Sequence, residues 1–245
     1  MAGVLSFLLV DLDALIAILP FPDGQRPEMP PWYLLKFASV AQPAVLTTVA
    51  VLAGLWMAPK VGLRAPAAEA FASGESYFSA LRPQILPGIV AGVSAGFLIV
   101  LSWVIVKPHL PEEFVTRSEA FNKMIPAVVR FLYGGLTEEV LLRWGMMSFL
   151  VWFLSALLRR EGPANWMLIS AILFSSLLFG AGHLPVASLL NGGLTPVLTL
   201  YVIGANALFG IFAGFLYWKR GLESAMIAHI FAHIVLLSAV NITLE

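Results

Sequence analysis

Residues 162–218 read GPANWMLISAILFSSLLFGAGHLPVASLLNGGLTPVLTLYVIGANALFGIFAGFLYW, and this stretch contains no Asp, Glu, Lys or Arg. It has room for two helices of about 20 residues, the length that crosses a lipid bilayer, with a polar turn at residues 191–193 between them. Similar uncharged stretches cover residues 37–59, 83–106 and 224–244. The sequence therefore predicts an all-α fold, a polytopic transmembrane bundle of about seven to eight helices.

The composition supports an integral, multi-pass membrane protein with a single domain over residues 1–245. Hydrophobic residues make up 60% of the chain and charged residues 11%, against about 45–50% and about 25% in soluble domains. The 14 basic and 14 acidic residues cancel, so no electrostatic footprint for nucleic acid is present and no nucleic-acid partner is expected. The absence of cysteine excludes disulfides, thiolate metal ligands and a thiol nucleophile.

Two predicted spans have unusual features. The first contains Asp11 and Asp13, which indicates a poor span or an interfacial helix. The fourth is too long for one straight span, and Gly134-Gly135 predicts a break in it. The seven predicted spans cover about residues 4–19, 34–57, 85–106, 125–158, 165–182, 195–217 and 222–241.

The loop charges give a mild topological signal. With seven spans, seven Lys and Arg residues lie on one side of the membrane and five on the other. The positive-inside rule then predicts a cytoplasmic N-terminus. It also places Glu138 and His183 toward the non-cytoplasmic side.

Ionisable groups inside predicted spans are the candidate functional residues. A charge at the bilayer centre costs about 2.5–3.5 kcal/mol on insertion scales, so it usually faces a cavity or a partner. Glu139 and Arg143 are four residues apart on one helix face and can form an ion pair. Glu138 points about 100° away from Glu139. We therefore predict a supporting Glu139–Arg143 pair and a working carboxylate, a general base, at Glu138.

Three histidines are candidate metal ligands. His183 ends the segment FGAGH, while His229 and His233 are four residues apart on one helix face, a spacing that suits two ligands of one ion. A divalent metal, zinc in the first instance, would take His183, His229 and His233 as ligands and hold a water. It would lower the pKa of that water toward about 7, and Glu138 could then take the proton. This chemistry is that of a metallopeptidase within the membrane.

The three polar segments resemble the motifs of the CAAX protease and bacteriocin-processing (CPBP, or Abi) family of intramembrane proteases. The family pattern is EExxxR, then FxxxH, then HxxxN or HxxxD, on separate transmembrane helices. Here the first motif matches residues 138–143, the second matches residues 179–183, and the third begins at His229. The resemblance covers about residues 126–237. It implies a catalytic core over residues 125–241, preceded by further helices over residues 1–124.

The resemblance also implies an activity and residue roles. Eukaryotic members remove the last three residues of prenylated CAAX proteins, and many prokaryotic members have other substrates. By resemblance, Glu138 and His183 activate water, and His229 lies beside the scissile carbonyl. The supporting residues are Glu139, Arg143 and Phe179. The expected partner is a membrane-associated protein or peptide, and the expected location is the cell (inner) membrane of a prokaryote.

Position 233 departs from the family pattern, because it is His where the family has Asn or Asp. Asn would donate a hydrogen bond to an oxyanion, and a neutral His could do the same. A His could also bind a metal ion more strongly than Asn does. The motifs are thus compatible with a metal-bound water and with activation by glutamate and histidine alone. The departure is also compatible with a catalytically silent scaffold or bacteriocin-immunity factor of the same fold. A coupled transporter ranks last, because the chain has no internal repeat.

Overall fold

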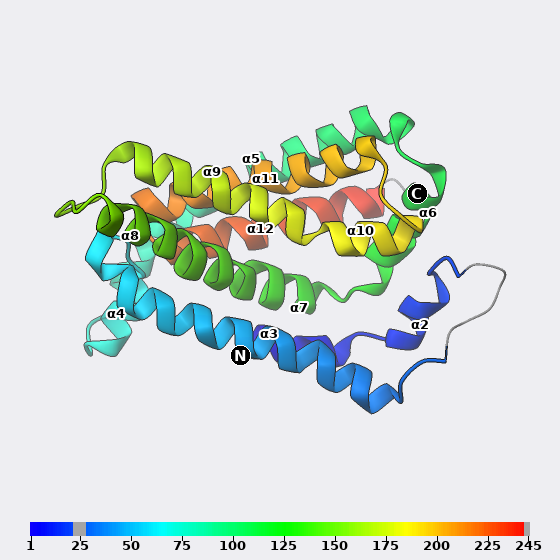
Figure 1. The fold of residues 1–245 in the computed structure, drawn as a ribbon, viewed down its shortest axis with the longest axis horizontal. Helices are drawn as coiled ribbons and strands as arrows, with labels where there is room; N and C mark the ends of the chain where they lie inside the picture. Colours follow the sequence, from blue (N-terminus) through cyan, green and yellow to red (C-terminus); the bar gives the residue numbers. More distant parts are fainter. Residues whose placement is uncertain (22–27, 243–245) are drawn as a thin grey trace.

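The computed structural model describes residues 1–21 and 28–242, and in these residues all regular elements are helices. Within this part of the chain, six helical stretches are long and apolar enough to cross a membrane. They lie side by side with their axes roughly parallel, and the chain reverses direction between neighbouring stretches (Figure 1). The predicted helical bundle is confirmed, with six such stretches where the sequence suggested seven spans. Their bounds are Trp32–Met57, Tyr77–His109, Ala127–Leu157, Asn165–Asn191, Pro196–Lys219 and Leu222–Ala239.

Two of the long helices begin at a residue whose side chain caps the helix. Ser76 precedes a long helix and accepts a hydrogen bond from Ser79 N, and Thr195 caps another in the same way at Leu198 N. The long helices are α3 (Trp32–Met57), α5 (Tyr77–Val106), α9 (Asn165–Gly182), α11 (Pro196–Lys219) and α12 (Leu222–Ile242). The shorter ones are η3 (Pro59–Val61), α4 (Pro66–Ala72), η4 (Lys107–His109), α6 (Glu112–Met124) and α10 (Leu184–Asn191).

The third spanning stretch continues through the glycine pair and widens there. It consists of α7 (Ala127–Val129), η5 (Arg130–Glu138), η6 (Val140–Met147) and α8 (Ser148–Leu157), and both η5 and η6 are π-helical. The predicted break at Gly134-Gly135 is therefore wrong. Both glycines lie against α12, where a Cβ atom at Gly134 would come within 2.6 Å of His233 Nε2. The glycines allow close helix packing, and π-helical turns are often found at functional sites.

The first predicted span is not a membrane-crossing helix. The structure divides it into α1 (Ala2–Leu5), η1 (Ser6–Leu9) and α2 (Leu12–Ala17). Val10 is extended, and the exposed Asp11 caps α2 by accepting a hydrogen bond from Ala14 N. Asp11 and Asp13 both stay exposed, which agrees with the prediction of a poor span or an interfacial helix. Without this crossing, the same charge bias no longer predicts a cytoplasmic N-terminus.

Small residues bring neighbouring helices into backbone contact. A Cβ atom at Gly92 of α5 would overlap the backbone of Ala228 in α12. A Cβ atom at Gly180 of α9 would lie 2.5 Å from Ile203 O in α11. Helices in a bilayer associate largely through such close van der Waals packing. The pairs α5–α12 and α9–α11 therefore form the tightest parts of the bundle and hold the helices that carry the histidines.

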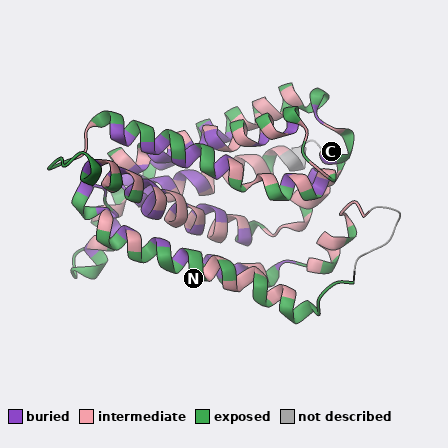
Figure 2. Cartoon of the chain, in the orientation of Figure 1, coloured by how far each residue is buried: buried purple, intermediate pink, exposed green. Residues whose placement is uncertain are grey.

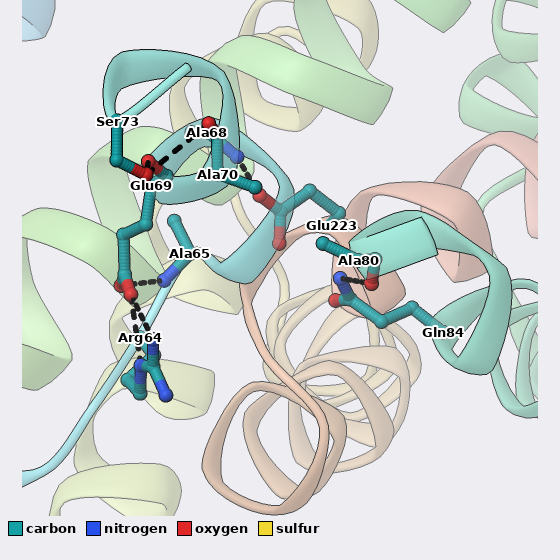
Figure 3. Close-up of polar contacts among 9 residues, drawn as sticks. All are labelled: Arg64, Ala65, Ala68, Glu69, Ala70, Ser73, Ala80, Gln84 and Glu223. Atoms are coloured by element: carbon teal, nitrogen blue, oxygen red, sulfur yellow. Dashed lines mark hydrogen bonds and ion pairs between the residues drawn. The ribbon is translucent and has the colours of Figure 1, made fainter. Parts of the chain in front are cut away.

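A polar junction fixes the start of α12. Ser224 donates from its backbone N to Gln84 Oε1 and from Oγ to Gln84 O, both at 3.1 Å. Glu223 Oε1 accepts from Ala68 N at 2.9 Å, so that α4 is tied to α12 (Figure 3). Nearby, the Glu69 carboxylate accepts hydrogen bonds from the exposed Arg64 guanidinium and raises its pKa. These contacts set the register of α12 against α5.

The outer faces of the bundle are apolar. Large hydrophobic side chains on α3, α5 and α11 are exposed, with Phe37 at 71%, Phe97 at 68% and Leu200 at 73%. Figure 2 shows exposed residues along the outer sides and buried residues where helices face one another. A surface of this kind suits contact with lipid chains. The polar residues of the motifs lie inside it.

Candidate active site

The motif residues come together from three helices. Glu138 is the last residue of η5, and Glu139 lies between η5 and η6. Phe179 lies on α9, and His183 follows the end of that helix. His229 and His233 lie on α12. Contacts between these helices join the first motif to the third and the second to the third. The structure thus gathers groups that are up to 95 residues apart in the sequence, from Glu138 to His233.

Glu139 and Arg143 form the predicted ion pair in the centre of the bundle. Arg143 Nε lies 3.2 Å from Glu139 Oε2, and the two side chains are 0% and 1% exposed. The Arg143 guanidinium also lies over the Phe179 ring, 5.8 Å from its centroid. A buried charge without its partner is strongly destabilising. The pair and the aromatic ring therefore tie η6 to α9.

Glu139 also binds a histidine, a contact that the sequence did not indicate. Its Oε1 lies 2.9 Å from His229 Nδ1. Because a carboxylate only accepts hydrogen bonds, Nδ1 carries the proton and donates it to this bond. The ring is then fixed in orientation, with Nε2 facing away from Glu139. A carboxylate that orients a histidine in this way is a common support for a catalytic group.

Glu138 reaches the other nitrogen of the same ring. Its Oε2 lies 3.8 Å from His229 Nε2, beyond direct hydrogen-bond distance but within reach of a bridging water. The Glu138 side chain is 19% exposed, whereas Glu139 is fully buried. The two adjacent carboxylates therefore lie on opposite sides of the His229 ring. Glu139 is the buried partner at Nδ1, and Glu138 lies near Nε2, where its partly exposed side chain can meet an incoming molecule.

Aromatic rings surround His229. Phe209 of α11 has its ring centroid 4.3 Å from the His229 ring, and Phe179 lies 5.8 Å away in an edge-on arrangement. Phe209 belongs to none of the three motifs, and in the sequence it is only an apolar residue within a predicted span. These rings exclude water from the buried side of His229. They strengthen its interactions with the two carboxylates.

His183 lies where α9 ends and α10 begins. Its Nδ1 is 2.9 Å from Phe179 O, so Nδ1 donates to that carbonyl and Nε2 is left as an acceptor. Its ring also packs edge-on against Phe179, with centroids 4.8 Å apart. Phe179 thus holds both His183 and His229, which gives the first residue of the second motif a positioning role.

His233 stacks on His229. The two rings are 4.9 Å apart and inclined by 17°, and Nδ1 of His233 is buried without a hydrogen-bond partner in the described residues. Nε2 of His233 faces Gly134 of η5, where a Cβ atom would come within 2.6 Å of it. The His at this family position therefore occupies the same cluster as the other motif residues.

The described residues do not form a three-ligand metal site. No group of three or more His, Cys, Asp or Glu side chains in residues 1–21 and 28–242 lies close enough to share one ion. The His229 and His233 rings stack, and the Nδ1 bonds of His183 to Phe179 O and of His229 to Glu139 leave Nε2 as the free nitrogen of both rings. As they lie in the structure, these donors do not form the three-histidine zinc site that the sequence suggests. The zinc site stays a prediction, and no chemical step below depends on it.

Two surface cavities lie away from the motif residues. One of about 330 Å³ is lined by residues of η1, α2 and α3, and another of about 430 Å³ is lined by residues of α5 and α11 together with Arg220. Neither is lined by Glu138, His183 or His229. The membrane-embedded catalytic cavity therefore stays a prediction.

Comparison with known families supports the resemblance. Residues 119–235 match the family model described as type II CAAX prenyl endopeptidase Rce1-like. Neither a curated protein nor a solved structure matches the chain. The matched residues include all three motifs. This match covers just under half of the chain, and over residues 119–235 the chain is similar to the Rce1-like type II CAAX prenyl endopeptidase family.

Proposed function

We propose that this protein hydrolyses a peptide bond of a membrane-associated protein or peptide, with CAAX-type substrates as the first candidates. The observation that carries the proposal is the position of His229 between two carboxylates, 2.9 Å from Glu139 and 3.8 Å from Glu138. One carboxylate orients the ring, and the other has access to a water molecule. The family match supports an endopeptidase. The proposed location is the cell membrane of a prokaryote.

In the proposed reaction, a water molecule lies between Glu138 and the histidines. Glu138 takes a proton from the water, whose oxygen attacks the carbonyl carbon of the substrate. His183 Nε2, left as an acceptor by the bond to Phe179, can hold the second hydrogen of that water. Glu138 then gives the proton to the leaving nitrogen as the C–N bond breaks, which yields a carboxylic acid and an amine and restores the Glu138 carboxylate.

His229 supplies the stabilising group for the oxyanion. Its Nδ1–H is bonded to Glu139, so when Nε2 also carries a proton, Nε2–H can donate to the negative oxygen of the tetrahedral intermediate. The Glu139–Arg143 pair keeps the ring in place during this step. A fixed donor of this kind typically contributes about 10²–10³ in rate.

The test is cleavage of membrane peptides by purified protein in vesicles, followed by mass spectrometry. Wild type should cleave, and Glu138→Gln should not. Glu119→Gln is the matched control, because Glu119 is an exposed glutamate that pairs with Lys107. Equal cleavage by wild type and Glu138→Gln would show that the proposed mechanism is wrong.

The departure at position 233 favours one alternative, a catalytically silent scaffold or immunity factor of the same fold. This alternative predicts that Glu138→Ala and His229→Ala both retain the cellular phenotype of the gene. Loss of the phenotype in either variant, with the protein still present in the membrane, would rule it out.

A further inference from the structure

A groove of about 430 Å³ lies between α5 and α11, away from the motif residues. On the α5 side it is lined by Ala91, whose small side chain leaves room for a ligand. On the α11 side it is lined by Ile211, Phe212, Phe215 and Leu216. Phe215 is 42% exposed, so the groove opens on the apolar outer surface of the bundle. Its volume is within the range of about 300–1,000 Å³ that small-molecule sites occupy.

The groove changes from apolar to cationic along its length. Lys219 and Arg220 complete the lining at the end of α11. Ile211 and Lys219 are eight residues apart, which is about 12 Å along a helix axis. An apolar groove that ends in two positive charges has the polarity pattern of a phospholipid, in which an apolar acyl chain leads to an anionic phosphate.

The two positive charges are not neutralised by the protein. Neither Lys219 nor Arg220 has a carboxylate partner among the described residues. Lys219 Nζ lies 3.4 Å from the centroid of the Trp218 ring, and the exposed Arg220 makes no side-chain hydrogen bond within the same residues. Glu223, the nearest acidic residue in the sequence, accepts a hydrogen bond from Ala68 N. An anion from outside the protein can therefore bind at this end of the groove.

The charged end of the groove lies on the side of the membrane where anionic lipids are found. With the six spanning stretches of the structure, this side holds seven basic residues and the other side five. The seven are Lys60, Arg64, Arg82, Arg159, Arg160, Lys219 and Arg220. The positive-inside rule makes this side cytoplasmic. The cytoplasmic leaflet is rich in anionic lipids, which attract basic side chains close to its surface.

We propose that the groove between α5 and α11 binds one anionic phospholipid of the cytoplasmic leaflet. An acyl chain would lie along the apolar residues of α11, and the phosphate would bind Lys219 and Arg220. The cavity lined by η1, α2 and α3 offers no such site, because its cation, Lys36, already donates to Leu8 O and Val10 O. The inference does not depend on the proposed peptidase function.

The test is native mass spectrometry of detergent-purified protein with an equal mixture of phosphatidylglycerol and phosphatidylcholine that have identical acyl chains. Wild type should retain about one phosphatidylglycerol per chain, with a preference of about 10- to 30-fold, the effect of two basic side chains near an anionic lipid. The double variant Lys219→Gln with Arg220→Gln should bring this ratio close to one. Ala91→Leu, which fills part of the groove, should lower the retention of both lipids.

The matched control is the double variant Arg159→Gln with Arg160→Gln. It removes two exposed basic residues from the same side of the membrane but outside the groove, and it should keep the wild-type ratio. An equal loss in the two double variants would show a response to overall surface charge and would overturn the site. A ratio near one in wild type would overturn it too, as would a preference that survives in Lys219→Gln with Arg220→Gln. Unchanged retention in Ala91→Leu would show that the lipid lies elsewhere.

Discussion

Glu139 accepts a hydrogen bond from His229 Nδ1 at 2.9 Å, and this single contact joins the first and third motifs across 90 residues of sequence. The same carboxylate balances the charge of Arg143. Glu139 therefore binds Arg143 on η6 and His229 on α12, and among the described residues no other carboxylate lies as close to either of them. Its replacement should affect both the chemistry and the stability of the bundle.

Glu139→Gln should lower cleavage by about 10²-fold or more, because the histidine it orients would lose its fixed protonation and direction. It should also destabilise the protein, since loss of one partner of a buried ion pair costs about 3–5 kcal/mol. Thermal unfolding in detergent checks the second effect. Glu113→Gln breaks the exposed pair with Arg117 and should cost less than about 1 kcal/mol. Similar unfolding temperatures for the two variants would contradict this account.

Glu138→Gln should separate chemistry from stability. The Glu138 side chain is partly exposed and forms no hydrogen bond in the described residues. We expect a loss of about 10²–10⁴ in kcat, the usual contribution of a general base, and a change in stability within about 0.5 kcal/mol. Both measurements should use the same purified sample. A large drop in stability would show that Glu138 is a structural residue.

Gly134 and His233 should depend on each other. A methyl group at position 134 would come within 2.6 Å of His233 Nε2. Gly134→Ala should therefore displace the His233 ring and lower both activity and unfolding temperature, by about 1–3 kcal/mol for overpacking. His233→Asn shortens the side chain, so the double variant Gly134→Ala with His233→Asn should recover stability. Additive losses in the double variant would mean that the two residues are independent.

Metal content distinguishes the two forms of water activation. Metal-free activation, which the lack of a three-ligand group in the described residues favours, predicts no stoichiometric zinc and cleavage that survives chelators. Mass spectrometry of detergent-purified protein, prepared without chelators, gives the answer directly. About one zinc per chain, lost in His183→Ala and His229→Ala, would restore the sequence prediction of a three-histidine site. His233→Asn would then show whether that residue is a ligand.

Two glycines in spanning helices offer a matched comparison of helix packing. A Cβ atom at Gly92 would overlap the Ala228 backbone, whereas one at Gly204 of α11 would meet no atom within 4 Å. Gly92→Ala should destabilise the bundle by about 1–3 kcal/mol. Gly204→Ala should be neutral or stabilising by up to about 1 kcal/mol, because alanine favours helix. Equal effects would show that the α5–α12 contact is looser than the structure indicates.

Sequence reasoning was most successful where hydrophobic length decides the structure. Six largely apolar stretches of the described residues are helices of spanning length, close to their predicted positions. It was least successful at the first predicted span, where Asp11 ends one apolar run and caps a new short helix. It also predicted a break at Gly134-Gly135, because glycine weakens an isolated helix. In the bundle, contact of this pair with α12 accompanies a continuous, widened helix.

Within the candidate site, spacing in the sequence predicted contacts on one helix but not those between helices. The Glu139–Arg143 pair follows from the interval of four residues. The bond from Glu139 to His229 does not, because it depends on how α12 packs against the π-helical segment. Phe209 was missed for the same reason, since an apolar residue in an apolar helix carries no distinguishing pattern.

The backbone contacts at Gly92 and Gly180 also limit how a substrate can arrive. An extended peptide needs about 4.7–4.9 Å between itself and a neighbouring backbone, yet α5 touches α12, and α9 touches α11, closely enough that a single methyl group would not fit at these glycines. A peptide that diffuses in from the surrounding lipid therefore cannot pass between α5 and α12 or between α9 and α11. A substrate must therefore approach Glu138 by another face of the bundle, and cross-links that bridge α5 to α12 should leave its passage unhindered.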